Sequence, residues 1–291
     1  EKAAAECRTI AARGATTSAA NNADPAATIR WSKPKRPGTR GSGWATGSRT
    51  SHAMMFPPPN PAAVPQFRLI VFAKYPRPGG VKTRLTPPLS PIDAAELYRA
   101  FLLDAICSYR TLPSSIETVI YLGAEADIPE LEALLAGDGG AGLKIRPQKG
   151  EGLGERLESA LAEAFDEGIR RACVVGTDHP TLPLRFLLEA FVGLHESSAV
   201  IGPATDGGYY LIGMDRLIPE LLRGMPYSTE QLLEQTLHAA MLHGIPLLRL
   251  HPWYDVDDAE SLAQLFADQA LLPPDSHTKR WLAEKKGGEE T

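Results

Sequence analysis

The chain has 291 residues, of which 43% are hydrophobic and 22% charged, enough for one large domain or two small ones. No apolar run approaches the length of a membrane span, and the three cysteines form no CxxC pair. These features argue against a membrane-spanning protein and a cysteine-rich zinc site, and they favour a soluble protein of the cytoplasm.

Charge divides the chain into two parts. Residues 1–65 carry nine Lys or Arg and three Asp or Glu, a net charge of +6, whereas residues 66–291 carry 21 and 32, a net charge of −11. An acidic body argues against nucleic acid as a partner.

Residues 1–65 lack apolar periodicity and end in FPPPNPAAVP, so we expect a disordered extension with a Pro-rich linker. Because the chain begins at Glu1, we also expect natural translation to start near Met54, which intact-mass measurement on the native protein would test.

From residue 66 onward, apolar runs that are typical of strands alternate with amphipathic segments that are typical of helices. Strands are predicted at 68–73, 117–122, 143–146, 172–175, 198–203, 209–212 and 245–250, and helices at 93–109, 128–135, in the second half of 148–165, at 184–194, at 228–243 and after 255–258. Ser228 and Gln231 suggest a capping box for the helix at 228–243, and no element is predicted for the polar end of the chain. The alternation predicts one α/β domain over 66–291, with a mainly parallel, Rossmann-like sheet in three α/β/α layers. Nucleotides bind such sheets at the carboxyl ends of the strands.

The first predicted strand leads directly into the basic, Gly-containing loop KYPRPGGVKTRL. Gly79 and Gly80 allow the backbone to approach a phosphate closely, and Lys74, Lys82 and Arg84 supply charge-assisted donors. The loop matches neither the P-loop nor the GxGxxG pattern. We interpret it as a nucleotide-binding loop, with a basic surface turn as the alternative.

A second Gly-rich turn, GEGLGER, precedes the helix predicted in the second half of 148–165. The backbone N–H groups at a helix N-terminus can hold an anion, so Gly152, Gly154 and Arg156 are further candidates for nucleotide binding. A simple entry turn into the helix remains equally open.

Acidic residues follow two of the later segments. Asp178 comes directly after the buried strand at 172–175, where an unpaired carboxylate would be costly, and is therefore the leading metal-ligand candidate. The alternative is an Asp that only caps the next helix. Alternation along the chain points Asp255 and Asp257 the same way, as a carboxylate pair for a divalent cation requires. Acidic residues at a helix start are, however, also favoured by the helix dipole alone.

The turn Asp206-Gly207-Gly208 joins two predicted strands and is followed by Tyr209 and Tyr210. It is either a substrate loop or merely a hairpin. Because side chains alternate along a strand, at most one of the two tyrosines is expected to face a site.

Five segments in this order resemble a bacterial family of GT-A-fold glycosyltransferase-like proteins, often called arsenosugar-biosynthesis glycosyltransferases: FAKYPRPGGVKTRL, GEGLGERL, VVGTDHPTLP, IGPATDGGYYLIG and DVDD. The resemblance covers roughly residues 67–268, and the architecture is similar to that of sugar-phosphate nucleotidyltransferases and 2-phospholactate guanylyltransferase. His179, Gly80 and Tyr227 depart from the family pattern, which more often has a small or thiol residue, a Lys and a Trp there.

The resemblance implies a nucleotide-diphospho-sugar transferase fold of the GT-A type. It also implies that Lys82 and Arg84 lie near the phosphates, that Mg²⁺ or Mn²⁺ binds at Asp178, Asp255 and Asp257, and that residues 206–209 line the acceptor or sugar pocket. We therefore expect a metal-dependent transferase that moves a glycosyl group from a nucleotide sugar to a small-molecule acceptor, with Asp178 and Asp206 as catalytic candidates. The alternatives are a nucleotidyltransferase that uses a nucleoside triphosphate, transferring a guanylyl, uridylyl or cytidylyl group to a phosphorylated small molecule, and a non-catalytic nucleotide-sugar binding protein.

Overall fold

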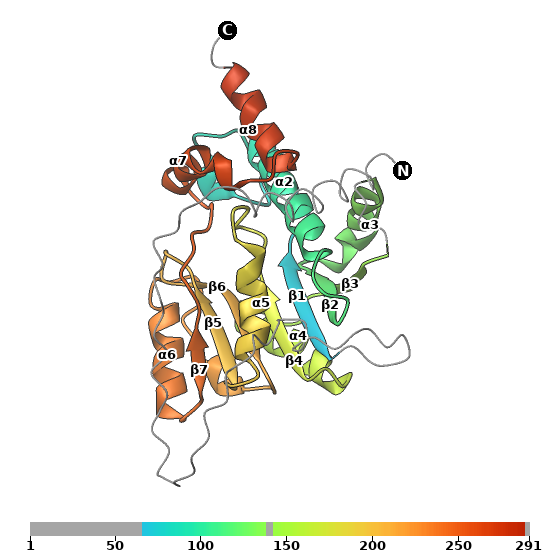
Figure 1. The fold of residues 1–291 in the computed structure, drawn as a ribbon. Helices are drawn as coiled ribbons and strands as arrows, with labels where there is room; N and C mark the ends of the chain where they lie inside the picture. Colours follow the sequence, from blue (N-terminus) through green and yellow to red (C-terminus); the bar gives the residue numbers. More distant parts are fainter. Residues whose placement is uncertain (1–65, 138–141, 289–291) are drawn as a thin grey trace, which may run out of the picture.

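A seven-stranded sheet forms the centre of the protein (Figure 1). The structure, a computed structural model, describes residues 66–137 and 142–288. The expected disordered extension over residues 1–65 therefore lies outside the described residues. In the sheet the strands follow the order β3-β2-β1-β4-β6-β5-β7. Their bounds are β1 Phe67–Ala73, β2 Ile116–Leu122, β3 Lys144–Pro147, β4 Arg171–Val175, β5 Ala199–Pro203, β6 Tyr209–Met214 and β7 Leu247–Arg249.

The sheet is mainly parallel, which confirms the prediction. β1 pairs in parallel with β2 and β4, β3 with β2, and β7 with β5, while β6 alone among the described strands runs antiparallel to its neighbours. Leu69, Ile70 and Val71 in β1 have no exposed surface, as expected for an apolar run that is covered on both faces. The carboxyl ends of β1 and β4 therefore reach the same edge of the sheet, and β6 begins there.

Helices cover both faces of the sheet and complete the predicted three layers (Figure 1). Residues of α2, α3 and α5 pack on one face, and residues of α4 and α6 pack on the other. Among the described residues, none of the helices combines the length and apolar character that are needed to cross a bilayer. The α-helices are α2 Pro91–Tyr109, α3 Ile128–Gly137, α4 Leu153–Asp166, α5 Leu184–Gly193, α6 Leu232–Leu242, α7 Ala259–Ala267 and α8 His277–Gly288, and the short 3₁₀ helices are η3 Thr83–Leu85, η4 Glu125–Asp127, η5 Pro219–Leu221 and η6 Gln269–Leu271.

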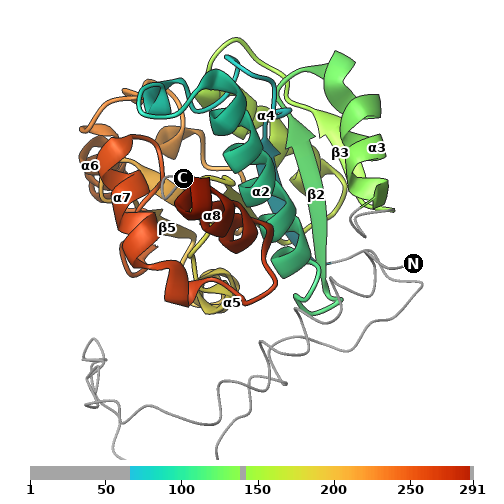
Figure 2. The same cartoon turned by 90° about the horizontal axis from the view of Figure 1, so that it is seen from above.

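The helix α8, which the sequence pattern did not predict, lies against α2 (Figure 2). Trp281 and Leu282 bury their side chains in a cluster that α2 and α7 share, but most other residues of α8 are polar. The first N–H groups of α8 are capped by Asp104, whose Oδ1 accepts from His277 N at 2.8 Å and whose Oδ2 accepts from Thr278 N at 2.8 Å. This cap lies 173 residues away in the chain, so no local pattern could reveal the helix.

The helix α6 begins at Leu232, so the predicted start at Ser228 with a capping box is wrong. Ser228 has a φ of 64°, which is outside the range of a helix cap. The segment before α6 instead packs against the turn at Gly207, whose carbonyl oxygen accepts from Leu233 N at 2.9 Å. A Cβ at Gly207, which has a φ of 88°, would lie 2.2 Å from Glu230 O. This tertiary contact overrides the local capping signal.

We expect Asp104→Ala to lower the free energy of unfolding by about 1–3 kcal/mol, because it leaves buried N–H groups of α8 without an acceptor. Urea denaturation measures the change. Lys285→Ala is the matched control, since it removes a partly exposed ion pair with Asp93 between the same two helices and a contact of the ammonium with the Trp281 ring, and it should cost about 1 kcal/mol or less. Equal losses in the two variants would show that the cap is not what holds α8.

Candidate functional site

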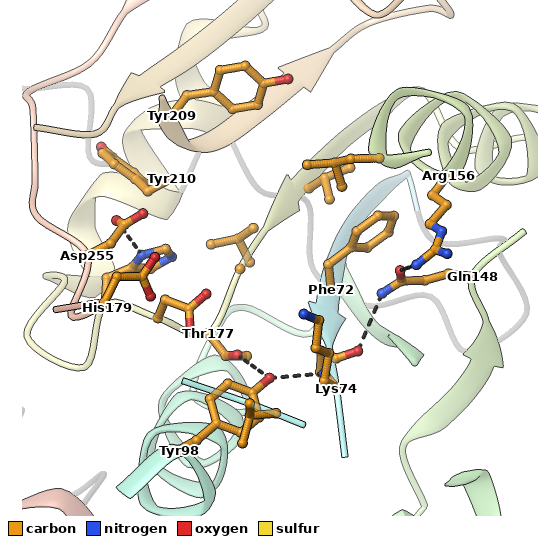
Figure 3. Close-up of a pocket in the computed structure, with 18 of the residues that line it drawn as sticks. Phe72, Lys74, Tyr98, Gln148, Arg156, Thr177, His179, Tyr209, Tyr210 and Asp255 are labelled. Carbon is orange, nitrogen blue, oxygen red and sulfur yellow. Dashed lines mark hydrogen bonds and ion pairs between the residues drawn. The ribbon is translucent and has the colours of Figure 1, made fainter. Parts of the chain in front are cut away.

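A cavity of about 600 Å³ lies at the carboxyl edge of the sheet, where β1 and β4 end and β6 begins (Figure 3). Both cations and carboxylates line it. The predicted site residues that it brings together are Lys74, Lys82, Arg84, Arg156, Asp178, Tyr209, Asp255 and Asp257.

Backbone pairing places the acidic residues beside the end of β4. Val256 N donates to Asp178 O at 2.9 Å, so the segment 255–257 runs next to Asp178. Val256 is fully buried in the cluster shared by α2, α7 and α8, whereas Asp255 and Asp257 on either side of it both line the cavity. The two carboxylates therefore reach the same cavity, as alternation along the chain predicts.

The ammonium of Lys82 joins two of these carboxylates. Its Nζ contacts Asp178 Oδ1 and lies 2.7 Å from Asp257 Oδ1, while Arg84 bonds the other oxygen of Asp257. Burial lowers the pKa of Lys82, but attraction to Asp178 and Asp257 outweighs burial and the pKa is raised. Burial likewise raises the pKa of Asp257, and the two cations reverse this effect so that its pKa is lowered. Lys82 and Asp257 are thus both ionised at neutral pH.

The converging oxygens of Asp178 and Asp257 fit a divalent cation that is completed by ligands from a substrate. Mg²⁺ is usually bound by one or two carboxylates together with phosphate oxygens and water. Over residues 66–137 and 142–288, no three His, Cys, Asp or Glu side chains gather closely enough to hold a metal by themselves. A phosphate-bearing substrate would supply the missing oxygens.

Asp255 pairs with His179 (Figure 3). His179 Nδ1 lies 3.0 Å from Asp255 Oδ1, and the imidazole packs edge-on against the ring of Tyr210. The other ring nitrogen, Nε2, is buried and has no hydrogen-bond partner among the described residues. His179 thus has a carboxylate partner of its own at the cavity wall.

Tyr98 on α2 ties together the ends of β1 and β4 (Figure 3). Its hydroxyl oxygen accepts from Lys74 N at 2.9 Å and from Thr177 Oγ1 at 3.0 Å. Burial and the nearby charge of Asp178 raise the pKa of Tyr98 to about 12, so the hydroxyl stays neutral. Sequence reasoning missed Tyr98 because it lies within the apolar face of a helix, where only its hydroxyl distinguishes it from core residues.

Arg156 is held at the cavity by neutral oxygens (Figure 3). Its Nε donates to Gly150 O at 2.9 Å and its Nη1 donates to Gln148 Oε1 at 3.4 Å, while Gln148 Nε2 donates to Tyr121 O at 2.9 Å. Within the described ranges neither Arg156 nor Lys74 forms an ion pair with a carboxylate. Their positive charge therefore remains available to an anionic ligand. Gln148 was also missed, since a single Gln before a Gly-rich turn carries no signal.

The four glycines that were expected to bind nucleotide lie beside the cavity rather than among the residues that line it. Gly80 N donates to Arg77 O at 2.9 Å and closes a turn in the first loop. Gly154 packs against another element, because a Cβ there would lie 2.6 Å from the Tyr227 ring. Gly152 and Gly154 line a second hollow next to the N-terminus of α4, and Gly79 has a φ of 76° that favours glycine.

The loop of Asp206, Gly207 and Gly208 is the turn of the hairpin between β5 and β6. Asp206 Oδ1 accepts from Gly208 N at 2.9 Å, which stabilises the turn. The Asp206 carboxylate is exposed and lies close enough to Arg84 to contribute, after Asp257 and against burial, to the raised pKa of that guanidinium. The loop therefore lies near Arg84, outside the residues that line the cavity.

Tyr209 and Tyr210 both line the cavity, so the expectation that only one would face it is wrong. The two side chains do lie on opposite faces of the sheet, packed in different core clusters. Because β6 begins at the edge where the cavity opens, the cavity reaches the side chains on both faces of this strand.

Comparison with known proteins agrees with this architecture. Residues 112–229 match the model of a family described as an uncharacterized protein conserved in bacteria (DUF2064). A crystal structure from Desulfovibrio desulfuricans G20, of a candidate nucleotide-diphospho-sugar transferase, has 32% sequence identity and a TM-score of 0.71, and the match covers 77% of this chain and 96% of that one. The chain belongs to this bacterial family of nucleotide-diphospho-sugar transferase-like proteins.

A curated relative of this family member is the 2-phospho-L-lactate guanylyltransferase of Methanothermobacter thermautotrophicus. The two are 29% identical over 130 residues, which is 44% of this chain and 53% of the relative, so the match spans about half of the relative's length. The fold and the family indicate a transferase of the nucleotide-diphospho-sugar transferase type.

We expect Tyr98→Phe to lower the free energy of unfolding by about 1–3 kcal/mol, because Lys74 N and the buried Thr177 hydroxyl lose their acceptor. Tyr109→Phe is the control on the same helix. Its hydroxyl makes only a 3.5 Å contact with Gly176 O, so its removal should cost less than about 1 kcal/mol. Chemical denaturation compares the two variants. If Tyr98→Phe is as stable as Tyr109→Phe, the Tyr98 hydroxyl does not hold the ends of β1 and β4 together.

Proposed function

We propose that this protein transfers a glycosyl group from a nucleoside-diphosphate sugar to a small-molecule acceptor, with the help of a divalent cation. The observation that carries the proposal is that the cavity at the carboxyl edge of the sheet contains both cations without carboxylate partners and a pair of converging carboxylates. Lys74 and Arg156 are cations without carboxylate partners among the described residues, and they line the same cavity as the converging carboxylates of Asp178 and Asp257. A diphosphate needs cations, and a metal that accompanies it needs carboxylates.

In this proposal each side of the cavity has its own role. Lys74 and Arg156 bind the phosphates, with the backbone of the neighbouring glycine turns as further donors. When held by Asp178 and Asp257, Mg²⁺ or Mn²⁺ supplies positive charge that stabilises the diphosphate as it leaves. Arg84 keeps Asp257 ionised and oriented.

The acceptor is proposed to bind near the hairpin turn. Asp206 is exposed close to Arg84, and Tyr209 lines the cavity from the first position of β6. Asp206 would contact the acceptor hydroxyl, while Gly207 and Gly208 let the turn approach it without side chains in the way. His179 and Asp255, which are paired with each other, also line the cavity.

Nucleotidyl transfer is the second candidate, and the similarity to a guanylyltransferase favours it. In that reaction a phosphate oxygen of the substrate attacks the α-phosphate of a nucleoside triphosphate and pyrophosphate leaves. The cavity has four cationic side chains that suit a triphosphate: Lys74, Lys82, Arg84 and Arg156.

The product distinguishes the two reactions. We expect the protein with Mn²⁺ to release a nucleoside diphosphate from one of a panel of nucleotide sugars, and Asp178→Asn to lower the rate on the order of a hundredfold or more, because a metal's charge is worth several kcal/mol in the transition state. Coupled assays for nucleoside diphosphate and for pyrophosphate measure both outcomes. Pyrophosphate release would establish the nucleotidyltransferase instead, and binding without either product would support a non-catalytic nucleotide-sugar binding protein.

Arg156 provides a separate test of where the phosphates bind. We expect Arg156→Met to weaken nucleoside-diphosphate binding by about tenfold or more, because a charge-assisted hydrogen bond contributes about 1.5–3 kcal/mol. Arg84→Met is the control, since its guanidinium is already paired with Asp257 and its side chain is 66% exposed. Titration calorimetry without metal gives the nucleoside-diphosphate affinity of both variants. A larger loss of affinity in Arg84→Met would show that the phosphates bind at the loop after β1 instead.

A further inference from the structure

The Lys82 ammonium lies where two carboxylates of the cavity converge. Its Nζ contacts Asp178 Oδ1 and lies 2.7 Å from Asp257 Oδ1, and its side chain is only 3% exposed. Two carboxylate oxygens that face each other across a cation are also the arrangement that binds a divalent metal. Because an ammonium and a divalent cation repel each other at short range, this position cannot hold both.

The local structure keeps Lys82 in this position. Its backbone has φ 49° and ψ 39°, a left-handed conformation that is unfavourable for a residue with a side chain. Its carbonyl oxygen accepts from Leu85 N at 2.9 Å. The rings of Tyr98 and Phe101 lie 5.9 and 5.6 Å from its Nζ. A strained residue that is restrained on several sides is characteristic of a functional position.

The ammonium cannot leave this position without replacement. Its departure would leave Asp178 and Asp257 facing each other, and two close carboxylates that are both ionised repel strongly. Each of the two carboxylates contacts the Lys82 Nζ directly, so a cation that enters between them has to move this ammonium aside. Once displaced, it remains a cation that needs a new anionic partner.

We infer that Lys82 is an internal counter-ion, which a divalent cation displaces from Asp178 and Asp257 and which then pairs with the phosphates of the bound nucleotide. The identity of that anion rests on the proposed function. The exchange makes metal and nucleotide binding mutually dependent. The metal releases the Lys82 ammonium, which the phosphates then bind. The phosphates in turn draw Lys82 away from the carboxylates, which the metal then binds. Lys82 thus competes with the metal for Asp178 and Asp257, and its absence should strengthen metal binding.

Mn²⁺ binding in the absence of nucleotide tests this inference without any assay of activity. Electron paramagnetic resonance of free Mn²⁺ gives its dissociation constant for the full chain. We expect Lys82→Met to bind Mn²⁺ about tenfold or more tightly than the unmodified protein, because the competing charge is gone. Arg84→Met is the matched control, since it removes a cation that touches Asp257 from the side and should change the affinity less. Adding Asp178→Asn to Lys82→Met should abolish the gain.

Stability gives a second readout. Lys82→Met should have a lower melting temperature than the unmodified protein without metal, and Mn²⁺ should raise it more than it raises that of the unmodified protein. Lys82→Gln serves the same purpose if the Met variant does not fold. Mn²⁺ affinity that is unchanged or weaker in the folded variants would overturn the inference.

The outcome is separable from that of the proposed function. Thermal shifts with ADP, GDP, CDP and UDP, each with and without Mn²⁺, ask whether any nucleoside diphosphate binds the unmodified protein. No shift with any of them would contradict the nucleotide site. Tighter Mn²⁺ binding by Lys82→Met would still support the counter-ion role, with a different anion as the partner.

Discussion

The parallel pairing of β1 with β4 is the constraint on which the cavity depends. Their register, with Val71 opposite Val175, brings the loop after β1 and the turn after β4 to one edge of the sheet. Tyr98 then joins both strand ends through a single hydroxyl oxygen. Residues about a hundred positions apart in the chain, Lys74 and Asp178, thereby line one cavity. Neither loop by itself supplies both signs of charge to the cavity, because the loop after β1 contributes the cations and the turn after β4 contributes a carboxylate.

The basic side chains of this acidic protein differ in whether a carboxylate neutralises them. Arg68 on β1 is 2% exposed and bonds Glu117 and Glu167, and Arg146 bonds Glu167 in turn. In this network, which joins the beginnings of β1 and β2 to β3 and α4, each cation meets a carboxylate. At the carboxyl edge, in contrast, Arg156 is held only by neutral oxygens among the described residues. A half-buried cation with neutral partners attracts anions, whereas a neutralised one does not.

The features that could be predicted from the sequence are those whose signal is local. The apolar run of β1 and the carboxylate after β4 follow from neighbouring residues, and the parallel sheet follows from the alternation of elements. Tyr98, Gln148 and α8 could not be predicted, because their roles depend on partners far away in the chain. The start of α6 was misplaced for the same reason, since residues near the start of the expected helix pack against the distant turn at Gly207. Hydrogen-bond partners across the fold decided each of these positions.

The difference between local signals and distant partners also explains the separate roles of Asp178, Asp255 and Asp257. Alternation along the chain correctly brings Asp255 and Asp257 to one cavity, but it cannot say which partner each carboxylate finds. The fold gives Asp257 the Lys82 ammonium and gives Asp255 the imidazole of His179. A carboxylate bound to an imidazole has one oxygen fewer for a metal, so the converging pair is Asp178 with Asp257. Which carboxylates a metal could use is therefore determined by the basic side chains around them, and these come from the loop after β1 and the turn after β4.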